Sequence, residues 1–169
     1  MFAWVAGLFY NLSMSQFLAQ NSEIIIRLLI AVGLGLLIGA ERLLVKEAAG
    51  MKTHALVSLG AAAFVIISEM IAVKYGGLTN FDPTRIASQV IVGIGFLGAG
   101  SIILQGSRLV GLTTAGGMWV TAGIGMAAGF GFYSLAVVTT VLVLFILTIV
   151  NIFERPIRKI SEDIDLPKV

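Results

Sequence analysis

Few residues of this chain could carry out chemistry, and most of them flank or interrupt long apolar runs. Arg27 and Glu69 each stand as a charge within such a run, and Arg85 stands near the start of another. A charged side chain at membrane depth is costly, so each is a candidate for function. Glu23 lies four residues before Arg27, a spacing that places both side chains on one helical face. The outer polar layer, as we define it, consists of Arg27, Glu69, Asp82, Arg85 and Gln89.

Two hypotheses explain the outer polar layer. It can be a structural layer of ion pairs whose long side chains reach the membrane interface, or it can bind a ligand. The carboxylates of Glu23, Glu69 and Asp82 could together hold hydrated magnesium, because this ion prefers carboxylates and water. The fold decides whether they lie close together, so the sequence leaves a metal site unknown.

A second group of polar residues lies where helices are predicted to begin. Thr53 and His54 follow a glycine at the start of one helix, and Thr113 and Thr114 do so at another. Hydroxyl side chains cap helix N-termini, and with nearby cations they can bind anions, although capping alone is the simpler explanation. His54 could sense pH or form a hydrogen bond within the bundle. This cytoplasmic polar cluster comprises Glu41, Arg42, Lys52, Thr53, His54, Thr113 and Thr114.

No set of residues matches a known catalytic arrangement. The sequence has no cysteine and one histidine, which excludes thiolate metal sites and argues against a site built from several histidines. It contains no P-loop, no HExxH motif and no nucleophile spaced to meet a base. The spacing Gly93-x-Gly95-x-x-Gly98 matches the dinucleotide-binding pattern, but no strand precedes it. We therefore expect a protein that is not an enzyme and has no cofactor.

The elements that must position these residues are membrane-spanning helices. The composition is 58% hydrophobic and 12% charged, whereas a typical soluble domain is roughly a quarter charged. Apolar runs near the length of a bilayer crossing fill most of the chain. The net charge of +2 comes from scattered basic residues, which indicates membrane topology rather than binding to nucleic acid. The sequence predicts an all-α membrane protein with about five transmembrane helices.

Charges and glycines predict where these helices begin and end. The uncharged run 109–153 would be about 67 Å long as a single helix, whereas a bilayer core is about 30 Å thick. The run must therefore turn, and Gly129-Phe130-Gly131 is the best place. The predicted helices are 24–40, 53–75, 82–104, 112–128 and 132–153. They form a transmembrane domain at 21–155, between an interfacial or flexible segment at 1–20 and a short cytoplasmic tail at 156–169.

Basic residues orient the predicted helices. Eight of the eleven lysines and arginines fall in the loop after the first helix, the loop after the third helix or the C-terminal tail. Cytoplasmic segments carry an excess of Lys and Arg. We therefore expect the C-terminus in the cytoplasm and the N-terminus outside.

Glycine-rich stretches indicate close helix packing and an internal repeat. The residues VGLG at 32–35 resemble VGIG at 92–95, and 50–53 resembles 111–114 at almost the same offset. Either two parallel helical hairpins are repeated and a fifth helix is added, or glycine-rich helices match by chance. Small residues let helix backbones touch, within one bundle or between copies. The predicted packing glycines are Gly35, Gly39, Gly93, Gly95, Gly98 and Gly100.

Several sequence blocks together resemble the membrane domain of the MgtC/SapB family. They are GLLIGAER at 35–42, AGMKT at 49–53, DPTRI at 82–86, QVIVGIGFLGAG at 89–100 and GLTTA at 111–115. The resemblance covers about 27–131 and implies a five-span protein of the bacterial inner membrane. The family is linked to growth under magnesium limitation and to survival of pathogens inside host cells. Its members are discussed as magnesium transporters and as regulators that bind other membrane proteins, ATP synthase among them, and many carry a cytosolic C-terminal domain.

Three functional hypotheses remain open from the sequence. The first is a non-enzymatic regulator of membrane partners in magnesium homeostasis or in stress and intracellular survival. The second is a channel or transporter for magnesium or another small ion, which would use the intramembrane polar residues. The third is an oligomeric scaffold held together by glycines. The expected partners are the lipid bilayer, other membrane proteins and further copies of this chain, but not nucleic acid.

Overall fold

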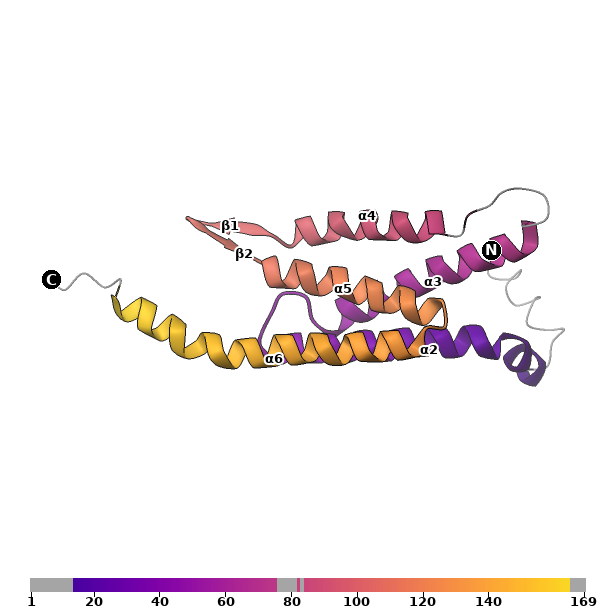
Figure 1. Ribbon diagram of the computed structural model, residues 1–169, viewed down its shortest axis with the longest axis horizontal. Coiled ribbons are helices and arrows are strands. Elements are labelled where there is room, and N and C mark those ends of the chain that lie inside the picture. The colour runs from indigo at the N-terminus through magenta and orange to yellow at the C-terminus, as the bar shows by residue number, and fades with distance from the viewer. Residues whose placement is uncertain (1–13, 76–81, 83, 165–169) are drawn as a thin grey trace.

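The computed structural model describes residues 14–75, 82 and 84–164 of the chain. Within these residues the chain forms five α-helices and one short β-hairpin (Figure 1). The elements are α2 (Met14–Leu44), α3 (Met51–Tyr75), α4 (Thr84–Gly100), β1 (Ile103–Gln105), β2 (Arg108–Val110), α5 (Leu112–Gly129) and α6 (Tyr133–Ile164). The predicted helical fold with five helices is confirmed, and the hairpin is an element that the sequence did not predict.

Three of the described helices are long and apolar enough to cross a membrane. They lie at Gln16–Leu44, Met51–Tyr75 and Tyr133–Val150. Helix α4 is also apolar, but it has only 17 residues. Length and composition of these helices therefore support the predicted membrane protein.

The helices at both ends of the described chain extend beyond the predicted spans. Helix α2 begins at Met14 and not at the predicted Ile24, so part of the segment predicted to be interfacial or flexible is helical. Helix α6 continues to Ile164, into the predicted cytoplasmic tail. The remainder of both predicted end segments, 1–13 and 165–169, lies outside the described residues.

The predicted C-terminal end of the third helix was wrong. It was expected to continue to Leu104, but α4 ends at Gly100 and the chain turns. The backbone N–H of Ser101 donates to Gly98 and that of Ile102 donates to Ala99, each across three residues. The Ser101 hydroxyl also donates to the Gly98 carbonyl, at 2.7 Å. The next apolar residues form β1, because a short apolar run can be either a helix end or a strand and hydropathy does not distinguish them.

The predicted turn between the last two helices is confirmed. Helix α5 ends at Gly129, and α6 begins at Tyr133. Gly131 adopts a φ of 77°, a left-handed conformation that favours glycine. The N–H of Phe132 donates to the carbonyl of Ala127 at 2.8 Å and closes the turn. The two helices therefore run side by side in opposite directions (Figure 1).

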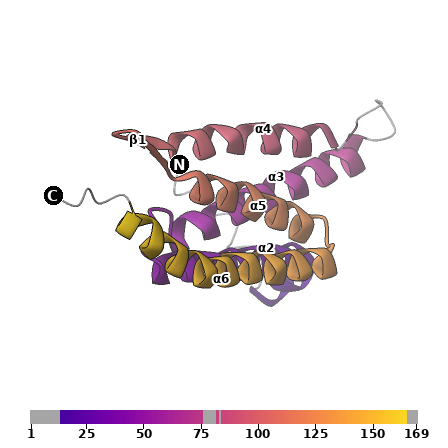
Figure 2. The same ribbon diagram turned by 60° about the vertical axis from the view of Figure 1, so that its left-hand side comes forward.

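Helix α5 is the centre of the bundle. It contacts each of the other four helices, and Figure 2 shows it between α4 on one side and α6 with α2 on the other. Its buried side includes Met118, Ala122, Ile124 and Ala128. Helix α4 packs against α5 and α3 and leaves most of its own surface exposed. The site residues must therefore be positioned mainly by α2, α3 and α5.

Glycines let the three inner helices approach one another closely. A Cβ atom at Gly35 would lie 2.7 Å from the carbonyl oxygen of His54, and one at Gly129 would lie 2.8 Å from that of Ala62. A Cβ at Gly39 would similarly lie 2.8 Å from the backbone nitrogen of Met51. Real Cβ atoms do not sit this close to backbone atoms, so α2 and α5 both pack on α3 through glycine.

The predicted packing glycines of α4 differ from those of α2. A Cβ at Gly98 would meet Ala115 at an ordinary distance of 3.7 Å. A Cβ at Gly93, Gly95 or Gly100 would meet no described atom within 4 Å. Packing by these three glycines against a second copy stays a prediction.

The proposed internal repeat also stays a prediction. The two hairpins share one local feature, which is a glycine immediately before the second helix. The N–H of His54 donates to the carbonyl of Gly50, and that of Ala115 donates to Gly111 in the same way. The connections differ, because α2 and α3 are joined by a loop and α4 and α5 by the β-hairpin.

Candidate functional site

At one end of the bundle, Arg27 joins three helices. From α2, its guanidinium donates to the carboxylates of Glu23 and of Glu69 on α3. It also donates to the carbonyl oxygen of Gly129, at the C-terminus of α5, at 2.9 Å. A cation at a helix C-terminus satisfies a free carbonyl and opposes the negative end of the helix dipole. We name this the Arg27 end.

The other members of the outer polar layer do not join Arg27. Asp82 accepts hydrogen bonds from the hydroxyl and the backbone N–H of Thr84, which hold the pKa of Asp82 below its usual value and cap α4. Arg85 and Gln89 are exposed on α4. The described residues contain no group of three His, Cys, Asp or Glu side chains that could hold a metal. Glu23, Glu69 and Asp82 do not form such a group, and a magnesium site built from them stays a hypothesis.

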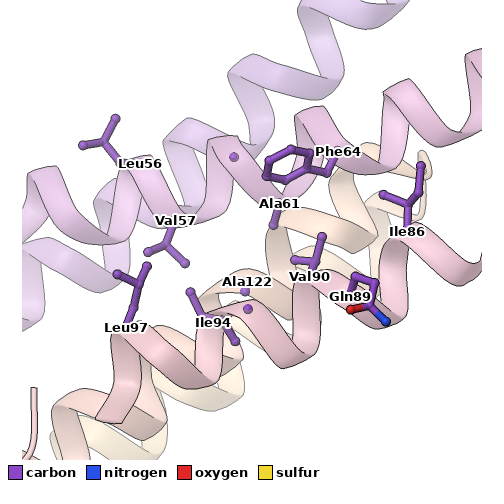
Figure 3. A pocket seen from close by; sticks show the side chains of 12 residues that line it. Leu56, Val57, Ala61, Phe64, Ile86, Gln89, Val90, Ile94, Leu97 and Ala122 are labelled. Atoms are coloured by element: carbon purple, nitrogen blue, oxygen red, sulfur yellow. The ribbon is translucent and has the colours of Figure 1, made fainter. Parts of the chain in front are cut away.

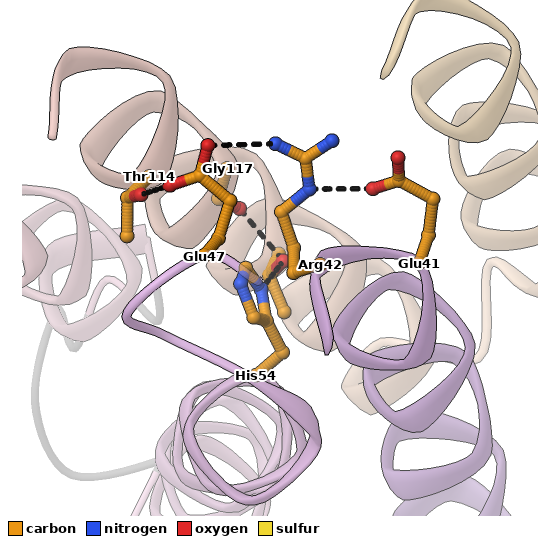
Figure 4. A network of polar contacts seen from close by, with 7 residues as sticks. Glu41, Arg42, Glu47, His54, Thr114 and Gly117 are labelled. Atoms are coloured by element: carbon orange, nitrogen blue, oxygen red, sulfur yellow. Dashed lines mark hydrogen bonds and ion pairs between the residues drawn. The ribbon is translucent and has the colours of Figure 1, made fainter. Parts of the chain in front are cut away.

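At the opposite end, the Arg42 end, a buried arginine connects α2 to α5. Arg42 is only 1% exposed. Its Nε donates to the carboxylate of Glu41, and its Nη1 lies 4.0 Å from the carboxylate of Glu47 (Figure 4). The hydroxyl of Thr114, in the first turn of α5, donates to Glu47 at 2.8 Å. The loop that follows α2 is thereby tied to the start of α5.

His54 forms a second buried contact at the Arg42 end. It is fully buried on α3, and its Nδ1 lies 2.9 Å from the hydroxyl oxygen of Thr121 on α5. The same hydroxyl donates to the carbonyl of Gly117 at 2.7 Å. His54 and Thr121 join α3 to α5 by a directional hydrogen bond.

The structure divides the predicted cytoplasmic polar cluster. It brings Glu41, Arg42, His54 and Thr114 together at the Arg42 end. Lys52 and Thr113 are exposed, and Thr53 is half-buried.

Two residues at the Arg42 end, Glu47 and Thr121, were not predicted from the sequence. Glu47 follows Arg42 in a charged stretch and could have been included on that ground. Thr121 stands in a glycine-rich apolar run and carries no such signal.

Comparison with protein families identifies this membrane bundle. A family model described as MgtC family matches residues 28–156, which is most of the chain. The chain belongs to the MgtC family. The resemblance carried by the glycine-rich blocks is thus confirmed, and the match extends past residue 131 to include most of α6.

Two relatives of this MgtC-family protein illustrate the match. The "Putative magnesium transporter YhiD" of Escherichia coli K12 is 42% identical over 135 residues, which cover 77% of this chain and 61% of that protein. The "Protein MgtC" of Salmonella typhimurium LT2 is 45% identical over 121 residues, covering 71% of this chain and 49% of that protein. The chain therefore spans about half to three fifths of these relatives. No solved structure matches it.

An apolar layer separates the two polar ends of this MgtC-family bundle. Between Arg27 and Arg42 on α2 lie Ala31 and Ile38, both fully buried. They pack in one cluster with Ala62 of α3 and with Ile124 and other residues of α5. Within the described residues of one copy, the polar clusters are thus divided by packed apolar side chains.

Two buried polar atoms at the Arg42 end, Nη2 of Arg42 and Nε2 of His54, have no hydrogen-bond partner among the described residues. The hydroxyl oxygen of Ser58, one turn further along α3 and beside Gly35, also has none among them. Buried polar groups are usually satisfied by protein or by ordered water, and an unsatisfied one costs about 1–3 kcal/mol. The Arg42 end is therefore more sensitive to changes in hydrogen bonding than an apolar core would be.

Replacing Thr121 with valine should destabilise the folded protein by about 1–3 kcal/mol, because the buried Nδ1 of His54 would lose its hydrogen-bond partner. Thr140→Val is the matched control. Thr140 is equally buried, but its hydroxyl donates to Ala136 within its own helix. Chemical unfolding of both variants in detergent micelles measures the difference. Equal losses of stability for the two variants would contradict the role of the His54 contact.

Proposed function

We propose that this MgtC-family protein is a non-enzymatic regulator that binds other membrane proteins in a bacterial inner membrane, in magnesium homeostasis or stress. The observation that carries this proposal is an open groove between α3, α4 and α5. The groove has a volume of about 500 Å³. The expected orientation, with the C-terminus in the cytoplasm, is part of this proposal.

The groove has the chemistry of a site for a partner helix. Figure 3 shows Phe64 and Val57 of α3 on one wall and Val90, Ile94 and Leu97 of α4 on the other. Gly60 and Gly93 also line it, and a Cβ at either would meet no described atom within 4 Å. Small residues that face open space allow another helix backbone to approach closely, which is how helices associate in membranes. Gln89 adds one polar group to an otherwise apolar lining.

Transport of a magnesium-type ion is the alternative function. It is favoured by the printed name of the relative YhiD. A hollow of about 790 Å³ beside Arg27, lined also by Glu23, Glu69 and Lys74, supports it too. The apolar layer argues against it, because an ion would have to cross packed side chains within one copy. A route between copies would avoid that layer, so ion flux must be measured directly.

Filling the groove should abolish partner binding without unfolding the protein. In Gly93→Leu, the added side chain enters open space in the groove. We expect membrane proteins that copurify with tagged wild-type protein from magnesium-limited cells to fall at least about tenfold, a loss of about 1.4 kcal/mol or more. Gly95→Leu is the control, because Gly95 is exposed on the same helix but does not line the groove.

The result distinguishes the two candidate functions when it is combined with a flux measurement. Partners retained by Gly93→Leu, or lost equally in Gly95→Leu, would contradict regulation through the groove. Purified protein in liposomes is expected to move no magnesium down a gradient. A flux that is reduced by Glu69→Gln would instead establish transport.

A further inference from the structure

The hairpin formed by β1 and β2 exposes apolar side chains on both of its faces. Ile103 pairs with Val110, and Leu104 pairs with Leu109. Side chains alternate between faces along a strand, so these two pairs point in opposite directions. The four side chains are 57%, 46%, 65% and 59% exposed, in that order. A two-stranded hairpin is marginally stable in water, and one that is apolar on both faces needs an apolar environment.

The position of the hairpin indicates which environment that is. It continues from the end of α4 and extends beyond the start of α5 (Figures 1 and 2). The 17 residues of α4 are about 25 Å long, which is less than the roughly 30 Å of a bilayer core. Strands of three residues add about 10 Å. Helix and hairpin together are therefore longer than the bilayer core, so the hairpin can reach the headgroup region.

The base of the hairpin is held firmly against the helices. Gly111 adopts a φ of 96°, and a Cβ there would overlap the carbonyl oxygen of Ser101. Only glycine allows the backbone at the two ends of the hairpin to approach so closely. The direction of the hairpin is thus set by α4 and α5.

The tip of the hairpin has a different chemistry from its stem. The residues at 105–108 are Gln, Gly, Ser and Arg, and Arg108 is exposed. Both outer edges of a two-stranded hairpin carry backbone N–H and C=O groups that need partners, so such edges do not lie in the hydrocarbon. Headgroups and water at the interface can supply these partners. Exposed Lys46 and Lys52 lie at the same Arg42 end and add positive charge.

We infer that the β1–β2 hairpin is a lipid-binding element in the headgroup region at the Arg42 end. Leu104 and Leu109 enter the boundary of the acyl chains, and Arg108 binds the phosphate of an anionic phospholipid. The hairpin continues from α4 into the headgroup region. This role depends on the membrane location of the bundle and not on the proposed regulatory function.

Depth measurements test the position of the stem. The chain has no cysteine, so Leu104→Cys, Leu109→Cys and Ser107→Cys each provide a unique site for an environment-sensitive fluorophore. The full chain is reconstituted in vesicles of phosphatidylethanolamine and phosphatidylglycerol. We expect quenchers attached high on the lipid acyl chains to quench the labels at 104 and 109, and aqueous iodide to quench the label at 107.

Two results would overturn the stem's position. Iodide quenching at 104 and 109 as strong as at 107 would place the stem in water. Protection of both labels from iodide and from lipid quenchers, with disulfide cross-linking between copies at 104, would make a second copy the partner instead.

A lipid-selectivity measurement tests the tip. Arg108→Gln should reduce the preference of the reconstituted protein for phosphatidylglycerol over phosphatidylcholine about fivefold, as expected for one arginine at an anionic surface. Energy transfer from Trp119 to labelled lipids of either class, with Trp4→Phe in every variant because the chain has two tryptophans, reports the preference. Lys74→Gln, which removes an exposed cation at the Arg27 end, is the control. An unchanged preference in Arg108→Gln would refute phosphate binding by the tip.

Discussion

Replacing Gly125 with alanine should destabilise the bundle more than any other single-methyl addition proposed for α5. A Cβ at this position would overlap the carbonyl oxygen of Ser58 and lie 2.8 Å from its Cα. Both atoms belong to the backbone of α3, so no side chain can rotate away and the two helices must separate. Overpacking usually costs about 1–3 kcal/mol and occasionally more. We expect the upper part of this range, because α3 and α5 are both central to the fold.

The neighbouring glycine provides a strict control for this prediction. Gly123 lies two positions earlier in α5, and a Cβ there would meet no described atom within 4 Å. Gly123→Ala should therefore be neutral or stabilising, since alanine favours a helix over glycine by about 1 kcal/mol. Thermal unfolding of both variants, followed by circular dichroism in the same detergent, measures the contrast. Equal melting temperatures would show that the tight contact between α3 and α5 does not hold in the folded protein.

Replacing Arg42 with methionine should cost about 3–5 kcal/mol, the range observed when one partner of a buried ion pair is removed. The side chain is almost fully buried and faces the carboxylates of Glu41 and Glu47. Methionine leaves these negative charges without their cation. Thr114, which donates to Glu47, would also lose part of its support at the start of α5.

Two further variants distinguish loss of charge from loss of packing. Lys52→Met removes an exposed cation from the same end and should change the free energy of unfolding little. The triple variant Arg42→Met, Glu41→Gln, Glu47→Gln should recover much of the lost stability, because neither the largely buried Glu41 nor the partly exposed Glu47 keeps a charge without its cation. Failure of the neutral triple variant to recover would mean that shape, and not charge, determines the contribution of Arg42.

The two largest predicted effects concern different parts of one scaffold. Gly125 controls how closely α3 and α5 approach, and Arg42 with His54 controls how the Arg42 end is joined. None of Gly125, Arg42 and His54 lines the groove between α3, α4 and α5. Variants that unfold the scaffold should therefore lose all functions together, whereas Gly93→Leu should lose partner binding alone. This difference separates a structural defect from a defect in regulation.

The sequence by itself determined the helical membrane class and most of the helix order. Apolar runs and the charges between them predicted five helices, because a chain cannot place charges or unpaired backbone groups in hydrocarbon without cost. The excess length of the last run required a turn, which lies at the predicted Gly129–Gly131. The four-residue spacing of Glu23 and Arg27 likewise predicted the ion pair that is present.

Only the tertiary structure decided which residues meet and which helix lies at the centre. Helix α5 is not among the three described helices that are long and apolar enough to cross a membrane. It nevertheless contacts every other described helix, because its glycines permit a close approach that hydropathy does not measure. Asp82 does not form a group with Glu23 and Glu69. Glu47 and Thr121 make contacts at the Arg42 end that sequence spacing did not reveal. Contacts between distant segments depend on how helices pack, whereas each helix depends on its own residues.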